Sequence, residues 1–152
     1  MSSLHFSVVG QSVTPTKFVA QARQFEVVID EPPVLGGQDD AANPVEYILA
    51  GYAGCLNVVG HLVAKELGIH LRKLSIRIEG DINPARFLGQ PTEERAGYKS
   101  LQVHLLPETD EGPELLQKWL QIVEARCPVN DNLRFPTPIS ITLPLTSRVY
   151  PN

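Results

Sequence analysis

Two cysteines, Cys55 and Cys127, are the residues of this sequence whose types and settings suggest redox chemistry. Cys55 lies inside a long apolar run, NPVEYILAGYAGCLNVVGHLVAKELG, and Cys127 opens CPVNDNLR at the end of a second amphipathic segment. If the fold brings the sulfurs together, one thiolate can attack an oxidant and the other thiol can resolve the product as a disulfide. The alternatives are a small buried hydrophobe for Cys55 and an ordinary residue near a helix end for Cys127.

Metal and nucleotide sites are not predicted. The histidines His5, His61, His70 and His104 are scattered, with none of the CxxC, HxxxH or HExxH spacings that gather ligands round one ion. The sequence also lacks the GxSxG of hydrolases and the GxGxxG of dinucleotide-binding loops. We therefore expect no metal and no bound cofactor.

Composition describes one globular domain spanning residues 1–152. Hydrophobic residues make up 43% and charged residues 20% of the chain, which argues against disorder. The net charge is −4 with no basic run, so nucleic acid is not an expected partner. The stretch Tyr47–Ala64 is interrupted by glycines, Asn57 and His61, which predicts a core helix and no membrane association.

The N-terminal sequence MSSLHFSVVGQS has neither the charged region nor the unbroken apolar region of a secretory signal. We therefore expect a cytoplasmic protein. In that reducing compartment the two cysteines are expected to be thiols rather than a structural disulfide.

Two helices are predicted to carry the cysteines. Asn43 can cap the first, with Pro44 at its first position and Glu46 placed to bond back to the cap, and this helix should end near Gly68. The second is predicted over Asp110–Cys127 from an apolar stripe with a period of about 3.6 residues. Pro128 should end it or start a short new turn.

The remaining segments predict strands by β-branched content or by alternation of apolar and polar residues. They are Leu4–Val9, Lys17–Ala20, Phe25–Ile29, Leu71–Ile82, Tyr98–Leu106 and Ile139–Leu143. Strands, helix, strands, helix and strand in this order indicate an α+β fold, with a largely antiparallel sheet and the helices on one side.

Four segments in this order, DEPPVLGG, NPVEYILAGYAGCL, ERAGYKSLQVHL and ARCPVNDNLR, resemble the OsmC/Ohr family of thiol-dependent hydroperoxide reductases. The resemblance covers about residues 25–143. It implies an OsmC-like fold, with a curved antiparallel sheet packed on two main helices in an intertwined homodimer. It also implies active sites at the subunit interface, where Cys55 is the peroxidatic thiol, Cys127 resolves it, and an Arg and a Glu assist.

The assisting residues match less directly. In the hydroperoxide reductases the Glu directly follows the NP pair, where this chain has Val45, and the nearest acid is Glu46. Nine helical steps of about 100° place Glu46 on the face opposite Cys55, so a capping role competes with a catalytic one. Arg23 is the one arginine before the first helix and the candidate cation, with Lys17 as alternative. Either could instead be a solvated surface charge.

The resemblance implies reduction of hydroperoxides in oxidative-stress defence, with an external dithiol as reductant. Cys55 must ionise before attacking a peroxide, and a nearby cation would favour its thiolate. Apolar neighbours of Cys55 in the sequence favour organic or fatty peroxides as substrates. The alternative is an OsmC-like dimer without peroxidase activity that holds a small apolar or thiol-containing ligand. A purely structural dimer module is the third reading.

Overall fold

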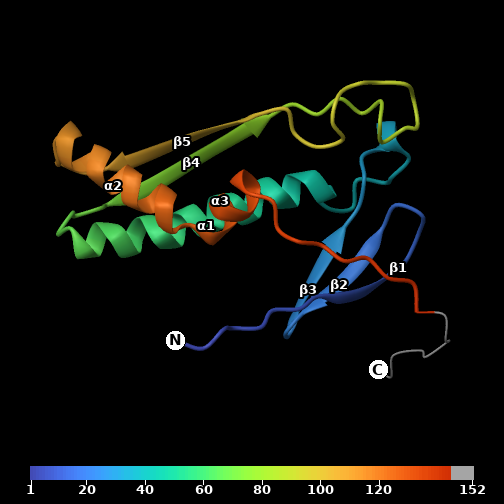
Figure 1. Ribbon diagram of the computed structural model, residues 1–152, viewed down its shortest axis with the longest axis horizontal. Helices are drawn as coiled ribbons and strands as arrows, with labels where there is room; N and C mark the ends of the chain where they lie inside the picture. Colours follow the sequence, from blue (N-terminus) through green and yellow to red (C-terminus); the bar gives the residue numbers. More distant parts are fainter. Residues whose placement is uncertain (145–152) are drawn as a thin grey trace.

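The strands form two separate antiparallel sheets, seen at opposite ends of Figure 1 in a computed structural model that describes residues 1–144. The first sheet has the order β1-β2-β3, made of β1 (Val9–Ser12), β2 (Phe18–Ala22) and β3 (Phe25–Ile29). The second is a two-stranded ribbon of β4 (Lys73–Gly80) and β5 (Leu101–Glu108), joined by a long connection. The α+β class and the antiparallel pairing predicted from sequence are therefore confirmed.

The long helix α1 (Pro44–Glu66) begins with the predicted capping box. The Asn43 side chain accepts a hydrogen bond from the Glu46 N–H at 2.9 Å, and the Glu46 carboxylate accepts one from the Asn43 N–H at 2.8 Å. Pro44 stands at the first helical position, where its missing N–H costs nothing. The helix ends just before Gly68, whose φ of 71° suits a residue without a Cβ.

A sharp corner at Cys127 separates the other two helices, α2 (Pro113–Arg126) and α3 (Pro128–Arg134). Cys127 has φ −78° and ψ 112°, so its extended backbone ends α2 and caps α3. Pro128 then occupies the first position of α3, because a residue before proline is driven to extended conformations. The short turn predicted after Pro128 is thus a helix of two turns, and a further single turn, η1 (Pro33–Leu35), precedes α1.

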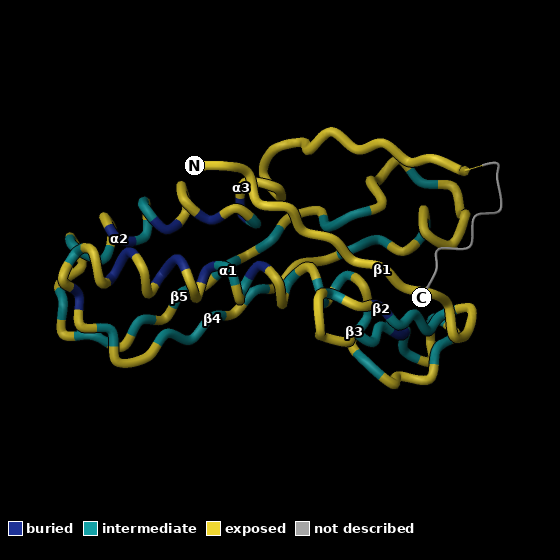
Figure 2. The backbone as a smooth tube through the Cα atoms, turned by 90° about the horizontal axis from the view of Figure 1, so that it is seen from below, coloured by how far each residue is buried: buried dark blue, intermediate teal, exposed yellow. Residues whose placement is uncertain are grey.

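The core lies where α1 meets α2, α3 and β4 (Figure 2). At its centre Trp119 of α2 donates its indole N–H to the Gly60 carbonyl of α1 at 2.8 Å. The buried cluster consists of Tyr52, Leu56, Val59, Val63, Ala64, Ile69, Trp119, Val123 and Cys127. Two of these side chains, Tyr52 and Cys127, belong to the candidate site, so the packing of the core also sets the geometry of the site.

The sheet β1–β3 lies beyond the N-terminal end of α1 and away from α2 (Figure 1). Its strands pack chiefly on one another, and the Tyr47 hydroxyl of α1 ties it to the helix by donating to the Val28 carbonyl at 2.6 Å. Apolar side chains of this part of the chain, including Val9, Val13 and Phe25, remain exposed. A single chain therefore leaves an apolar surface uncovered here.

Two predicted strands differ from the structure. Within the segment predicted as Leu4–Val9, only Val9 belongs to a strand, because hairpin pairing with β2 begins at that residue. The strand predicted at Ile139–Leu143 is wrong: these residues have no secondary structure and are exposed, Ile141 at 91%. An alternating pattern marks a segment suited to pairing, but no strand within residues 1–144 pairs with this one.

Helix α1 is long and apolar enough, by length and composition, to cross a membrane. The core helix of a globular protein can have the same length and composition. One face of α1 packs on α2 and β4, whereas Val58 and Leu62 on another face are exposed.

Candidate redox site

The sulfur atoms of Cys55 and Cys127 lie 3.0 Å apart, with the Cys127 thiol donating a hydrogen bond to the Cys55 sulfur. Cys55 comes from the middle of α1, and Cys127 from the corner between α2 and α3. Both cysteines are thiols in this structure. Only a small movement separates this pair from a disulfide, which needs a sulfur–sulfur distance of about 2.05 Å.

The two thiols differ in exposure. Cys127 is 1% exposed, whereas Cys55 is half-buried. Burial, together with the hydrogen bond to Cys55, raises the pKa of the Cys127 thiol above its ordinary value. Cys127 therefore stays protonated at neutral pH and acts as a donor, which stabilises negative charge on the Cys55 sulfur.

A second link joins the same two elements beside the sulfurs. The Tyr52 hydroxyl of α1 donates to the Asn130 side-chain oxygen of α3 at 2.5 Å, and both residues are buried. The Asn130 backbone N–H in turn donates to the Cys127 sulfur at 3.4 Å. Burial, more than the nearby Cys127, raises the pKa of Tyr52, so its hydroxyl stays a donor at neutral pH.

Arg134 completes this network on its outer side. Its Nε donates to the Asn130 side-chain oxygen at 3.2 Å, and its guanidinium pairs with the Glu124 carboxylate. Sequence reasoning gave no catalytic role to Tyr52, Asn130 or Arg134. The spacing of Asn130 from Cys127 in CPVN, which is that of a cap and its partner, was the available signal.

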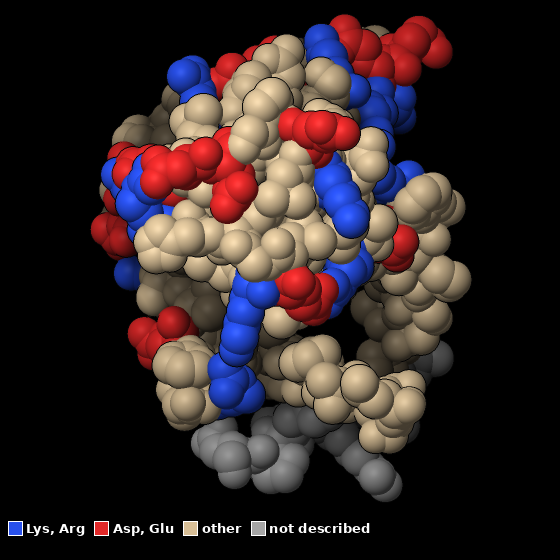
Figure 3. Space-filling model, turned by 90° about the vertical axis from the view of Figure 1, so that its left-hand side faces the viewer, with Lys and Arg blue, Asp and Glu red and all other residues tan. Residues whose placement is uncertain are grey.

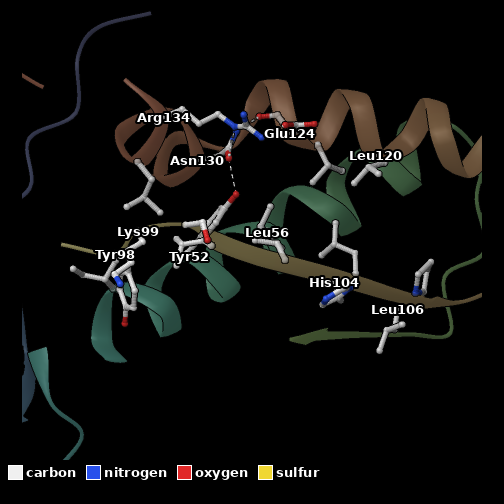
Figure 4. A pocket seen from close by; sticks show the side chains of 18 of the residues that line it. Tyr52, Leu56, Tyr98, Lys99, His104, Leu106, Leu120, Glu124, Asn130 and Arg134 are labelled. Carbon is white, nitrogen blue, oxygen red and sulfur yellow. Dashed lines mark hydrogen bonds and ion pairs between the residues drawn. The ribbon is translucent and has the colours of Figure 1, made fainter. Parts of the chain in front are cut away.

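A cavity of about 990 Å³ opens beside the network (Figure 4). Tyr52 and Leu56 of α1 lie on one side, Asn130 and Arg134 of α3 on another, and β5 forms a further wall. Leu116, Leu120 and Val123 of α2 add apolar surface, and Arg95 and Lys99 add positive charge. The cavity has room for a ligand with an apolar body.

The structure does not bring Glu46 to the sulfurs within one chain. Its carboxylate is used in the capping box, and its side chain is exposed. Nine residues of helix separate it from Cys55 by about 13 Å along the axis. Glu46 instead lies near Tyr98, whose pKa is raised by burial and then by the Glu46 charge. The capping interpretation is confirmed, and a catalytic role for Glu46 stays a prediction.

Arg23 occupies the turn between β2 and β3, with a left-handed φ of 57°. Its guanidinium stacks over the Phe25 ring at 5.0 Å from the centroid, and the residue is exposed. The alternative cation, Lys17, pairs with the Asp40 carboxylate at 3.0 Å. In the described part of a single chain, neither cation forms a hydrogen bond to a cysteine.

Charges of both signs alternate on the face shown in Figure 3. The Glu66 carboxylate and the Arg126 guanidinium link α1 to α2 through two hydrogen bonds of 2.6 and 3.2 Å. Residues 1–144 contain no group of three or more His, Cys, Asp or Glu side chains that could hold a metal ion. His61, exposed on α1, bonds through Nδ1 to the Asn57 carbonyl of its own helix.

Known proteins share both the sequence pattern and the fold. Residues 37–142 match the family model described as OsmC-like protein. A hydroperoxide reductase of Mycoplasma genitalium is 27% identical over 82% of this chain and 86% of its own length.

Two solved structures are similar in fold. The first is an OsmC-like protein from Mycoplasma pneumoniae, with a TM-score of 0.75 and 19% identity over 88% of this chain and 89% of the other. The second is a putative organic hydroperoxide resistance protein from Vibrio cholerae that holds captopril in one of its active sites. Its TM-score is 0.65, with 20% identity over 90% of this chain and 88% of the other.

Proposed function

Because the chain belongs to the family of OsmC-like proteins, we propose that it reduces organic hydroperoxides with Cys55 as nucleophile and Cys127 as resolving thiol. The single observation that carries the proposal is the 3.0 Å separation of the two sulfurs. Their unequal environments support the assignment of roles. The half-buried Cys55 accepts a hydrogen bond, and the buried Cys127 has a raised pKa and donates it.

The proposed reaction begins with the Cys55 thiolate. It attacks the terminal oxygen of the hydroperoxide, the O–O bond breaks, and the alkoxide leaves as an alcohol after taking up a proton. Cys55 then carries a sulfenic acid. The Cys127 sulfur attacks the sulfenic sulfur, an S–S bond forms, and the S–O bond breaks to release water. An external dithiol reduces the disulfide and is itself oxidised to a disulfide, which returns both cysteines to thiols.

The cavity supports organic rather than inorganic peroxides as substrates. Neither cysteine is among its lining residues, but Tyr52 and Leu56, which are, flank Cys55 on α1, and much of the surrounding wall is apolar. An apolar substituent on the peroxide would gain about 25 cal/mol for each Å² that it buries there, whereas hydrogen peroxide gains nothing. The proposal includes a cytoplasmic setting, because the cycle requires reduced cysteines.

A homodimer is part of this proposal. The exposed apolar residues of β1–β3 and the exposed Val58 and Leu62 on α1 would be covered by a second copy of the chain. Arg23 lies in a sheet that packs chiefly on itself, so any help that it gives to a thiolate would be given across that interface. Lys17 is less available for this role, because Asp40 already pairs with it.

The test measures peroxide consumption with an excess of dithiothreitol. We expect the wild-type protein to consume cumene hydroperoxide faster than hydrogen peroxide, and to lose two thiols per chain when no reductant is present. Cys55→Ser keeps the volume and removes the nucleophile, so its rate should fall to background. Cys127→Ser should still react once and then accumulate sulfenic or sulfinic acid at Cys55. Full peroxidase turnover by Cys55→Ser would end the proposal.

A binding protein without peroxidase activity is the second candidate. The observation that favours it is the placement of Glu46 in a helix cap and of Arg23 in an exposed turn. Captopril, found in the Vibrio cholerae relative, is a thiol compound of the kind such a protein would hold. One equivalent of cumene hydroperoxide separates the two functions: unchanged free thiols support the binder, and a Cys55–Cys127 disulfide supports the enzyme.

A further inference from the structure

Tyr52 and Asn130 stand in matching positions around the two cysteines. Tyr52 precedes Cys55 by three residues on α1, and Asn130 follows Cys127 by three residues on α3. Their hydrogen bond of 2.5 Å therefore runs beside the sulfur pair and connects the same two elements. We infer that the Tyr52–Asn130 bond is a positioning link that holds the resolving thiol of Cys127 against Cys55. The inference rests on the proposed function and adds two residues to it.

Both the backbone and the side chain of Asn130 are hydrogen-bonded to the corner that carries Cys127. Its backbone N–H donates to the Cys127 sulfur at 3.4 Å, and its side-chain nitrogen donates to the Glu124 carbonyl of α2 at 2.9 Å. Arg134 donates to the side-chain oxygen that also receives the Tyr52 hydroxyl. Any movement of Asn130 away from Tyr52 therefore carries Cys127 with it.

The corner gains from such a tie because the helix that follows it is short. Cys127 is an extended residue between two helices, and α3 has only seven residues, too few for an isolated helix to be stable. The Tyr52 hydroxyl and the Asn130 amide are both buried, and a hydrogen bond in a low-dielectric interior is stronger than one in water. Their bond, drawn as a dashed line in Figure 4, anchors the short helix to the long one.

The chemical consequence concerns the closing of the disulfide. When a sulfenic acid on Cys55 is attacked by Cys127, the S–S bond forms within one chain, and its rate depends on how often the sulfurs are in reach. Loss of the link should lower the effective concentration of Cys127 at Cys55. The first reaction of Cys55 with a peroxide should depend less on the link, because Cys127 supplies only a hydrogen bond in that step and forms no covalent bond.

The first experiment measures this effective concentration without any peroxide. The reduced protein is equilibrated with oxidised glutathione, and one protein dithiol plus one glutathione disulfide gives one protein disulfide plus two glutathione thiols. We expect Tyr52→Phe to lower this equilibrium constant by about three- to tenfold, the range for one lost buried hydrogen bond. Tyr47→Phe is the matched control: it removes a hydroxyl bond from the same helix, to the Val28 carbonyl at 2.6 Å, and should leave the constant unchanged.

A second variant removes the acceptor of the Tyr52–Asn130 hydrogen bond. Asn130→Ala keeps the backbone N–H at the Cys127 sulfur and removes the acceptor of the Tyr52 hydroxyl. It should lower the same constant. Asn130→Ala also removes the bonds to the Glu124 carbonyl and from Arg134, so the double variant should be no worse than Asn130→Ala alone, in which the Tyr52 bond is already lost. Where Tyr52→Phe fails to fold, Asn130→Ala against wild type decides the question. A constant within twofold of wild type for Asn130→Ala would overturn the inference.

The peroxide reaction supplies the readout that a general loss of stability would not produce. With Tyr52→Phe, the share of oxidised Cys55 that goes on to sulfinic acid should increase severalfold over wild type, because resolution by Cys127 is slower. If Tyr47→Phe lowered the glutathione equilibrium constant and raised the sulfinic acid yield as much as Tyr52→Phe does, the inference would be overturned. A wild-type protein inert to peroxide but with a Tyr52-dependent glutathione equilibrium would overturn only the proposed function and support the positioning role.

Discussion

The indole N–H of Trp119 points at the carbonyl of Gly60 and lies 2.8 Å from it, so that α2 is locked to the middle of α1. Gly60 lies between Cys55 and the end of α1, and Trp119 lies two turns of α2 before Cys127. A Cβ at residue 60 would stand 2.9 Å from the Leu74 side chain and 3.2 Å from the Trp119 ring, so both side chains would have to shift to admit it. This contact sets how far apart the helices hold the two cysteines.

Trp119→Phe should therefore destabilise the protein by about 1–3 kcal/mol, from one lost hydrogen bond and a smaller buried ring. The measurement is the midpoint of urea unfolding. Gly60→Ala tests the same contact from the other helix and should cost a similar amount, about 1–3 kcal/mol, through overpacking. Wild-type midpoints for both variants would show that α1 and α2 are held together elsewhere.

Alkylation should distinguish the two thiols. At pH 7.5 iodoacetamide should modify Cys55 before Cys127, because Cys127 is 1% exposed and its raised pKa keeps it a thiol. A thiol with a raised pKa ionises only at higher pH, so labelling of Cys127 should increase as the solution becomes strongly alkaline. Peptide mass spectrometry reads both sites. Faster labelling of Cys127 at neutral pH would contradict the assigned roles.

Glu46 can be tested for both of its roles with two substitutions. Glu46→Ala removes the oxygen that accepts from the Asn43 N–H and should cost about 0.5–1 kcal/mol of stability. Glu46→Gln retains a capping oxygen and removes only the charge, so its stability should stay near wild type. Peroxide kinetics of the same pair decide the catalytic role: a slower reaction in both variants supports it, and wild-type rates in both assign Glu46 to the cap alone.

Acid stability should depend on Asp30, which is buried and accepts bonds from the backbone N–H groups of Gln38 and Asp40. Burial by itself would raise the pKa of this carboxyl, but the N–H donors outweigh it and the pKa is lowered. The unfolded chain therefore binds a proton first, below about pH 3.9, and stability is lost as the pH falls from there through the folded pKa. In Asp30→Asn the midpoint of urea unfolding should therefore depend less on pH in this acid range. An unchanged pH dependence would contradict the stabilising role of the Asp30 carboxylate.

The proposed dimer predicts a charge-sensitive face on α1. Val58 is 65% exposed in the single chain, and Val58→Asp should shift the protein from the mass of two chains to that of one. Light scattering after gel filtration measures this shift. Lys118→Glu, which adds negative charge on the exposed side of α2, is the control and should leave the mass unchanged. A wild-type protein with the mass of one chain at micromolar concentration would contradict the dimer.

The sequence by itself determined the local elements. The Asn43–Glu46 capping box, the stop near Gly68 and the corner at Cys127 and Pro128 depend on contacts within a few residues, and all are found where the sequence predicts them. The order of helices and strands and the family resemblance likewise followed from short motifs. The predicted strand at Ile139–Leu143 failed because pairing depends on a distant partner, which an alternating pattern does not specify.

Only the tertiary structure decided which of the chemically competent residues meet. The 3.0 Å between the sulfurs and the Tyr52–Asn130 bond join positions 72 and 78 residues apart. Such contacts depend on how the side chains of α1, α2 and α3 pack, and small changes in helix separation would open them. The same packing leaves Arg23 in a distant turn and Glu46 at the start of its helix, although Glu46 stands in a recognisable motif and Arg23 is the one arginine before that helix. Spacing along a chain identifies groups able to react, and packing determines the distance between them.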